Sequence, residues 1–150
     1  MNHRSIFKLL TVVFLLGLAA CSGGQSKGPV ACSGGQSKGP VEVQVTATDF
    51  AFQSSLTTFE VGVPYHFVVT NNGQTEHEFM IVKPIPAGSM DMEEMDQMAI
   101  GHIEEDDLQP GNTASVDVTF TEPAPEGTLE MSCHLPGHYE NGMLLPITVK

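Results

Sequence analysis

The feature that most constrains this chain is a short loop, late in the sequence, that is rich in metal-binding side chains. Cys133, His138 and Met143 follow the spacing Cys-x4-His-x4-Met between two apolar runs. A thiolate, an imidazole and a thioether are the ligands that suit copper, and a trigonal copper site needs a second histidine. His77 can supply it, because it opens the apolar run 77–82 just after the turn-forming Asn-Asn-Gly at 71–73.

Each of these residues has an ordinary interpretation when it is taken alone. A buried cysteine often behaves as a small hydrophobic residue, and methionine often fills gaps in a core. Three ligand types at a fixed spacing, with a histidine on a separate strand, are much more specific than any single residue. The combination therefore indicates copper.

The loop, with its Pro-Gly-His, and the upstream histidine resemble the type 1 copper site of the cupredoxins, the family of plastocyanin, azurin and auracyanin. The resemblance covers nearly all of residues 42–150. It implies that His77, Cys133, His138 and Met143 bind one type 1 copper. It also implies that the ring of His138 reaches the surface and passes electrons there, within an apolar patch formed by Leu135, Pro136, Tyr139 and Leu144.

From Glu42 onward, alternating apolar and polar residues with turn signals every eight to twelve residues predict an all-β chain. The expected strands are 43–47, 57–61, 65–70, 77–82, 113–121, 128–133 and 144–149, with an aromatic-x-aromatic step at 49–52. About seven strands in a domain of this length predict a Greek-key β-sandwich, like that of the cupredoxins. Alternation within 65–70 places Tyr65, Phe67 and Val69 on one face and His66 on the other, so His66 is expected to face solvent without a metal role.

Residues 83–109 interrupt this pattern and predict a short helical insertion. The segment 91–100 is expected to be an amphipathic helix, with Ser89 or Asp91 as its N-cap and acidic residues in its first turn. Two interpretations of its methionines remain open. Either they pack on the sandwich as gap-fillers, or they form a second, transient Cu(I) site, whose contacts would be Met90, Met92, Met95, Met98 and His102.

Residues 1–20 have the pattern of a signal peptide. Arg4 and Lys8 precede the apolar run 9–20, which is too short for a stable membrane-spanning helix. The run ends in Leu-Ala-Ala before Cys21, which resembles the bacterial lipobox and implies that Cys21 is lipidated. The protein is then expected outside the cytoplasm, anchored to a bacterial membrane by lipid. Ordinary secretion or an uncleaved anchor is the alternative.

A perfect repeat separates this signal from the globular part. Residues 20–30 recur letter for letter as residues 31–41, and both copies are dominated by Gly, Ser, Gln, Lys and Pro. Such a composition predicts a flexible tether over residues 21–41, ahead of a single domain at 42–150. Cys32 is a spare copy of Cys21 created by the repeat, so no structural disulfide is expected.

The chain is strongly acidic, with a formal net charge of −12. Eight of its 18 acidic residues lie between Asp91 and Asp107. This charge excludes nucleic acid as a partner, because phosphates would be repelled. A redox protein with a basic docking surface, or incoming copper ions, would be attracted. Solubility alone would also account for the charge.

The predicted ligand set favours an electron carrier over an enzyme, because neither an open coordination position nor a general base accompanies it. Multicopper oxidases have histidines on both sides of the type 1 cysteine, whereas here Ser132 and His134 flank Cys133. His134 is therefore either an electron exit or an ordinary loop residue. Two other functions remain open: copper binding or delivery through the Met-rich acidic segment, and an oxidase or reductase subunit with further copper sites in partner chains.

Overall fold

The computed structural model describes residues 39–86 and 88–150. The predicted signal peptide, the predicted lipidation site Cys21 and nearly all of the repeated tether lie outside these residues. Within the described part no helix is long and apolar enough to cross a membrane.

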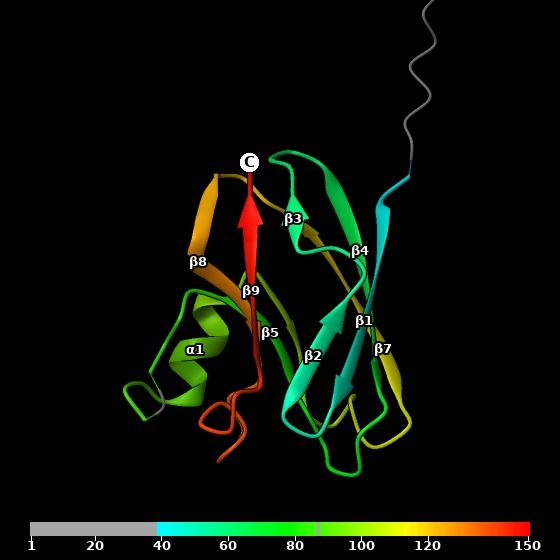
Figure 1. Cartoon of the computed structure of the whole chain (residues 1–150), viewed down its shortest axis with the longest axis vertical. Coiled ribbons are helices and arrows are strands. Elements are labelled where there is room, and N and C mark those ends of the chain that lie inside the picture. The colour runs from blue at the N-terminus through cyan, green and yellow to red at the C-terminus, as the bar shows by residue number, and fades with distance from the viewer. Residues whose placement is uncertain (1–38, 87) are drawn as a thin grey trace, which may run out of the picture. The chain divides into compact units, whose positions relative to one another are not determined.

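Two β-sheets and one short helix make up the described part of the chain (Figure 1). The first sheet has the strand order β2-β1-β4-β7, and the second has the order β3-β9-β8-β5-β6. The strands of the first sheet are β1 (Val41–Thr48), β2 (Ala51–Ser54), β4 (Pro64–Asn71) and β7 (Thr113–Thr119). Those of the second sheet are β3 (Thr58–Phe59), β5 (Phe79–Val82), β6 (Gly101–Ile103), β8 (Ala124–Ser132) and β9 (Leu144–Val149). Helix α1 spans Met92–Met98. The predicted all-β sandwich with a helical insertion is confirmed.

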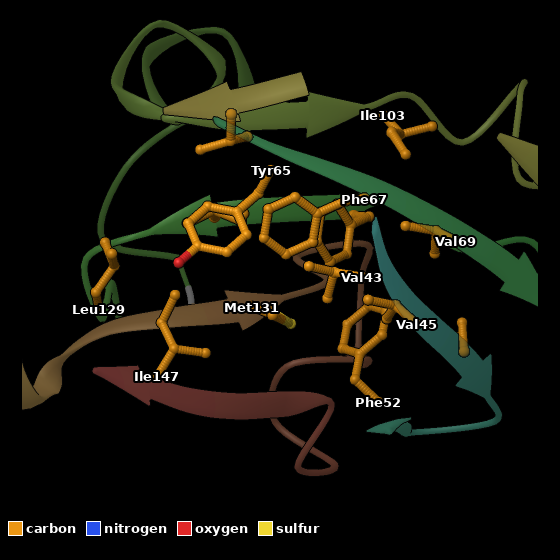
Figure 2. Packing of buried hydrophobic residues seen from close by; sticks show 14 of the residues in the cluster. Val43, Val45, Phe52, Tyr65, Phe67, Val69, Ile103, Leu129, Met131 and Ile147 are labelled. Carbon is orange, nitrogen blue, oxygen red and sulfur yellow. The ribbon is translucent and has the colours of Figure 1, made fainter. Parts of the chain in front are cut away.

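The core lies between the two sheets, where inward-facing side chains meet (Figure 2). Strand β4 shows the predicted alternation, since Tyr65, Phe67 and Val69 are at most 5% exposed. His66, on the other face of that strand, lies 2.6 Å from the carboxylate of Asp117. Aromatic rings form a continuous cluster from one sheet to the other: Phe52, Phe59, Tyr65, Phe67, Phe79 and Phe120. Burial of these large rings contributes strongly to the stability of the sandwich, together with the aliphatic residues of the same core.

Several elements differ from those expected. Strand β5 begins at Phe79 rather than at His77, so the histidine lies on the loop before the strand. Strand β6 was not predicted, because a three-residue strand within an acidic segment carries almost no periodic pattern. The helix ends at Met98, and Asp91 rather than Ser89 caps it by accepting a hydrogen bond from the backbone N–H of Glu94.

Helix α1 packs beside β5 at one side of the second sheet (Figure 1). Met95 is 5% exposed and lies in a small apolar cluster with Met80, Val82 and Ile85. Met98 is 49% exposed and lies outside that cluster. Half-buried residues complete the packing: Met90, Met92 and Ala99. Met90, Met92 and Met95 therefore pack on the sandwich, whereas Met98 does not.

Three connections lie at the same end of the sandwich, which is the lower end in Figure 1. They are the turn between β1 and β2, the loop between β4 and β5, and the loop between β8 and β9. The third of these contains the Cys-x4-His-x4-Met sequence. Contacts between side chains of the three connections confirm that they meet. This end of the fold brings together residues that are more than 50 positions apart.

Candidate metal centre

The expected convergence of His77, Cys133 and His138 is present. One ligand atom from each residue lies within 4.8 Å of the other two. The Nδ1 atoms of the two histidines are 3.2 Å apart, and Nδ1 of His138 is 3.3 Å from Sγ of Cys133. Both His77 and Cys133 are fully buried. Three donor atoms from two connections thus surround one point beneath the surface.

The chemistry of these donors fits a soft or borderline metal ion. Burial, followed by the proximity of His138, lowers the pKa of His77, so its ring is neutral and offers a lone pair. Burial raises the pKa of Cys133 to about 12. Such a thiol keeps its proton unless a cation stabilises the thiolate, so metal binding would release that proton. Two imidazoles and one buried thiol are a donor set that suits copper.

Met143 completes the loop that carries two of these donors. It is fully buried, its backbone N–H donates to the carbonyl of His138 at 3.1 Å, and its carbonyl accepts from the N–H of Cys133 at 3.2 Å. Gly137 and Gly142 have φ angles of 85° and 96°, which glycine adopts without steric cost. These two tight turns fold the connection over residues 133–143 back on itself, so that Cys133, His138 and Met143 lie on one compact loop.

His77 is held by a loop that the sequence pattern did not identify as part of the site. The side chain of Asn71 is fully buried and donates to the carbonyls of Thr75 and Leu108 at 2.8 and 2.7 Å. Its oxygen accepts from the backbone N–H of Gly73 at 2.8 Å. These three bonds fix the connection between β4 and β5, which carries His77. The Asn-Asn-Gly turn was the only signal for this role.

The outer nitrogen of His77 faces Asp49 and the backbone of Gly73. Nε2 lies 3.8 Å from Oδ1 of Asp49 and has no hydrogen-bond partner. A hydrogen bond from the backbone N–H of Gln74 lowers the pKa of Asp49, which keeps this carboxylate charged. Such a carboxylate beside the outer nitrogen is the usual way in which a metal-binding histidine is oriented.

Glu78 is a buried carboxylate directly behind the site. It is 1% exposed, and its Oε1 accepts a hydrogen bond from the backbone N–H of His134, the residue after Cys133. Burial raises the pKa of Glu78 to about 7. An acidic residue within the apolar run 77–82 was the available sequence signal, and the role of Glu78 was missed.

The predicted apolar patch around His138 contains an additional residue. Phe50 is 43% exposed, has a φ of 64°, and lies edge-to-face on the His138 ring with 5.5 Å between centroids. A positive φ is unusual for an aromatic residue and is costly unless its surroundings impose it. Pro136 is exposed, and three residues of the patch are half-buried: Leu135, Tyr139 and Leu144. His134, one of the residues considered as an electron exit, is only 9% exposed. Its ring stacks on that of Tyr139, with 4.5 Å between ring centroids.

The residues expected at a second copper site separate into two groups. A pocket of about 430 Å³ is lined by Met90, Met92 and Met95. His134 also lines this pocket, although the sequence did not group it with the methionines. His102 does not line this pocket and faces acidic side chains instead. Met98 does not line it either.

No protein-family model matches the chain. Among curated proteins, it is 26% identical over 139 residues to the copper-resistant cuproprotein CopI of Pseudomonas aeruginosa, covering 72% of this chain and 75% of that protein. It is 29% identical over 113 residues to the protein of the same name from Rubrivivax gelatinosus, covering 72% of this chain and 66% of that protein.

Solved structures with a similar fold include two auracyanins. The dithionite-reduced auracyanin of Roseiflexus castenholzii matches with a TM-score of 0.57 and 20% identity, over 73% of this chain and 97% of that one. Auracyanin B matches with the same TM-score and identity, over 75% of this chain and 91% of that one. The chain therefore has the cupredoxin fold, with His77, Cys133, His138 and Met143 as the donor set of one type 1 copper.

Proposed function

We propose that this protein is a single-electron carrier and not an enzyme in its own right. Copper held by two imidazoles, a thiolate and a thioether exchanges one electron between its two oxidation states. The observation that carries the proposal is the arrangement of the donors. Their atoms already face one another at 3.2–3.3 Å, in a buried site fixed by two hydrogen-bonded loops. Side chains held in this way need to move little when the charge at the site changes.

His138 is the route by which electrons would leave this site. Its ring is half-buried, so one edge reaches the surface while Nδ1 points inward. Phe50 and Pro136 are exposed beside it and give the surrounding surface an apolar character. An apolar surface around a buried redox centre allows close approach of a partner without desolvating charges.

The test measures electron self-exchange of the copper-loaded protein in two matched variants. Phe50→Asp places a charge beside His138, and aspartate tolerates the positive φ at that position. Leu56→Asp introduces the same charge at another exposed apolar residue, which lines a separate pocket with Val41 and Lys150. We expect at least a tenfold slower exchange for Phe50→Asp, with an unchanged visible spectrum and a much smaller effect of Leu56→Asp. Equal rates in the two variants would refute an exit at His138.

The proposal extends to the location of the protein and its partner. It places the protein outside the cytoplasm, held to a bacterial membrane by lipid on Cys21, where it exchanges electrons with a redox protein that has a basic docking surface. The acidic segment 91–107 supports such a partner by charge complementarity. Metabolic labelling of the protein with a radioactive fatty acid, and its loss in Cys21→Ala, tests the anchor.

Copper binding and delivery is a second candidate, favoured by one specific observation. Three thioethers and one imidazole line a single pocket next to the copper loop, and thioethers are ligands for Cu(I). The relatives named copper-resistant cuproproteins support a role in handling copper. In this function the pocket would take up Cu(I) close to Cys133, since His134 belongs to both the pocket and the copper loop.

A matched pair of methionine variants separates the two candidates. Replacing Met90, Met92 and Met95 together with leucine removes the pocket thioethers, whereas Met98→Leu removes one that lies outside it. Leucine preserves the apolar volume, so both variants should fold. For a carrier, neither variant changes the affinity for Cu(I), measured by competition with a chromophoric chelator. Weaker Cu(I) binding in the triple variant alone would establish the delivery function.

A further inference from the structure

A second cluster of potential ligands lies on the other side of Glu78 from the copper loop. It consists of Asp96 on helix α1, His102 on strand β6 and Glu104 just after that strand. Nδ1 of His102 lies 3.7 Å from Oδ1 of Asp96 and 3.7 Å from Oε1 of Glu104. One ligand atom from each of the three residues lies within 4.8 Å of the other two.

These separations are too long for hydrogen bonds, which join nitrogen and oxygen at about 2.7–3.2 Å. They are close to the spacing of two ligands on one ion, because bonds of about 2.0–2.1 Å in a tetrahedral site place ligand atoms about 3.3 Å apart. Oδ1 of Asp96 is buried without a hydrogen-bond partner. A small closure of the three side chains would let a cation satisfy it.

The buried carboxylate of Glu78 is an independent indication of how His102 is used. Glu78 is 1% exposed, and its Oε2 has no hydrogen-bond partner. This oxygen lies 4.0 Å from Nε2 of His102, which is also buried and without a partner. A metal-binding histidine usually directs its outer N–H toward a carboxylate, and this orients the ring and its tautomer. The present separation is too long for a hydrogen bond, but a small closure of the two side chains would let Glu78 hold the proton on Nε2 and leave the lone pair on Nδ1 facing Asp96 and Glu104.

We propose that Asp96, His102 and Glu104 form a second metal site, for a divalent transition-metal ion of the zinc or Cu(II) type. One imidazole and two carboxylates are ligands that these ions accept, and thioethers take no part. The charge balance also favours a cation, because the cluster lies within the segment 91–107 that holds eight acidic residues. The site joins helix α1 to strand β6. It is distinct from the Met-lined pocket and independent of the electron-carrier function.

The test is calorimetric titration of the Cu(II)-loaded protein with zinc, while the visible band confirms that copper stays in its own site. The expected result is one zinc per chain in addition to copper. His102→Ala and Asp96→Asn should each weaken zinc binding at least tenfold, since loss of even an outer partner of a metal ligand typically costs 10- to 100-fold. Asp96→Asn keeps the size of a half-buried helical side chain, so it covers the case in which His102→Ala fails to fold.

The matched control is His66→Ala. His66 also lies beside a carboxylate, that of Asp117 at 2.6 Å, but it belongs to no group of three potential ligands among the described residues. Zinc affinity should be unchanged in this variant. Absence of zinc binding to the parent protein would overturn the proposal, and so would affinities that are equal in the parent, His102→Ala and Asp96→Asn. Several weak equivalents that survive Asp96→Asn would show only general attraction to the acidic surface and would overturn it as well.

Discussion

Gly73→Ala is the most informative single change near the copper site, because it alters no ligand. A Cβ atom at position 73 would lie 2.6 Å from Oδ1 of Asp49, 2.8 Å from Nε2 of His77 and 3.1 Å from Oδ1 of Asn71. Ordinary contact begins at about 3.4 Å, so these atoms would have to move by about 0.8, 0.6 and 0.3 Å. All three belong to groups that hold the loop before β5.

The expected cost of Gly73→Ala is about 1–3 kcal/mol of unfolding free energy, the usual range for added volume at a closely packed position. A shift of about 0.6 Å at Nε2 would also displace Nδ1 of His77, because the imidazole ring is rigid. That shift is a large fraction of a metal–nitrogen bond of about 2.0 Å. The visible spectrum of the Cu(II) protein should therefore change together with the stability.

Gly101→Ala is the matched control, because its Cβ would lie 2.7 Å from Cγ2 of Val118, within the sandwich and away from the copper ligands. Urea titration of the copper-free proteins gives the unfolding free energies, and absorption spectra of the copper-loaded proteins report on the site. Both variants should be destabilised, but only Gly73→Ala should change the spectrum. If Gly73→Ala left the spectrum unchanged and lowered the unfolding free energy by less than about 0.5 kcal/mol, the close approach of residue 73 to Asp49, His77 and Asn71 would be refuted.

Three further changes test other parts of the site. Asn71→Ala should lower the unfolding free energy, measured by urea titration, by about 2–4 kcal/mol, since the buried carbonyl of Leu108, the carbonyl of Thr75 and the N–H of Gly73 lose their partner. A loss below about 1 kcal/mol would show that these bonds do not hold the loop. Tyr139→Phe should cost about 1–3 kcal/mol, because its hydroxyl donates at 2.8 Å to Glu130, which is 4% exposed; unchanged stability would contradict this. Cys133→Ser should abolish the thiolate-to-copper absorption band, and a variant that keeps the band would remove Cys133 from the ligand set.

Much of the fold follows from local pattern. Alternation in 65–70 predicted which face of β4 is buried, because successive side chains of a strand point to opposite faces. Strand β6 and the start of β5 were not predicted correctly. Their residues are few, and the long-range pairing of β5 with β6 and β8 defines them more than their own sequence does.

At the copper site, too, one part of the arrangement was predictable from the sequence and another part was not. Spacing alone indicated that Cys133, His138 and Met143 share one loop, because a connection of only 11 residues keeps them close in any fold. His77 was a candidate because it opens an apolar run after a turn, and the structure provides the contact, with its Nδ1 3.2 Å from that of His138.

The residues that surround the ligands were decided by tertiary structure alone. Phe50, Asn71 and Glu78 lie far from position 133 in the sequence. Their local signals are weak: a turn sequence at Asn71 and an acidic residue within an apolar run at Glu78. Likewise, one of the two open interpretations grouped His102 with the methionines, yet pairing of β6 with β5 directs it toward Glu78 and Asp96. The sequence determined which donor atoms and which buried faces are available, since both depend on residue type and short-range period. Strand pairing decided which distant side chains meet, because a one-residue change of register would turn each of them to the opposite face.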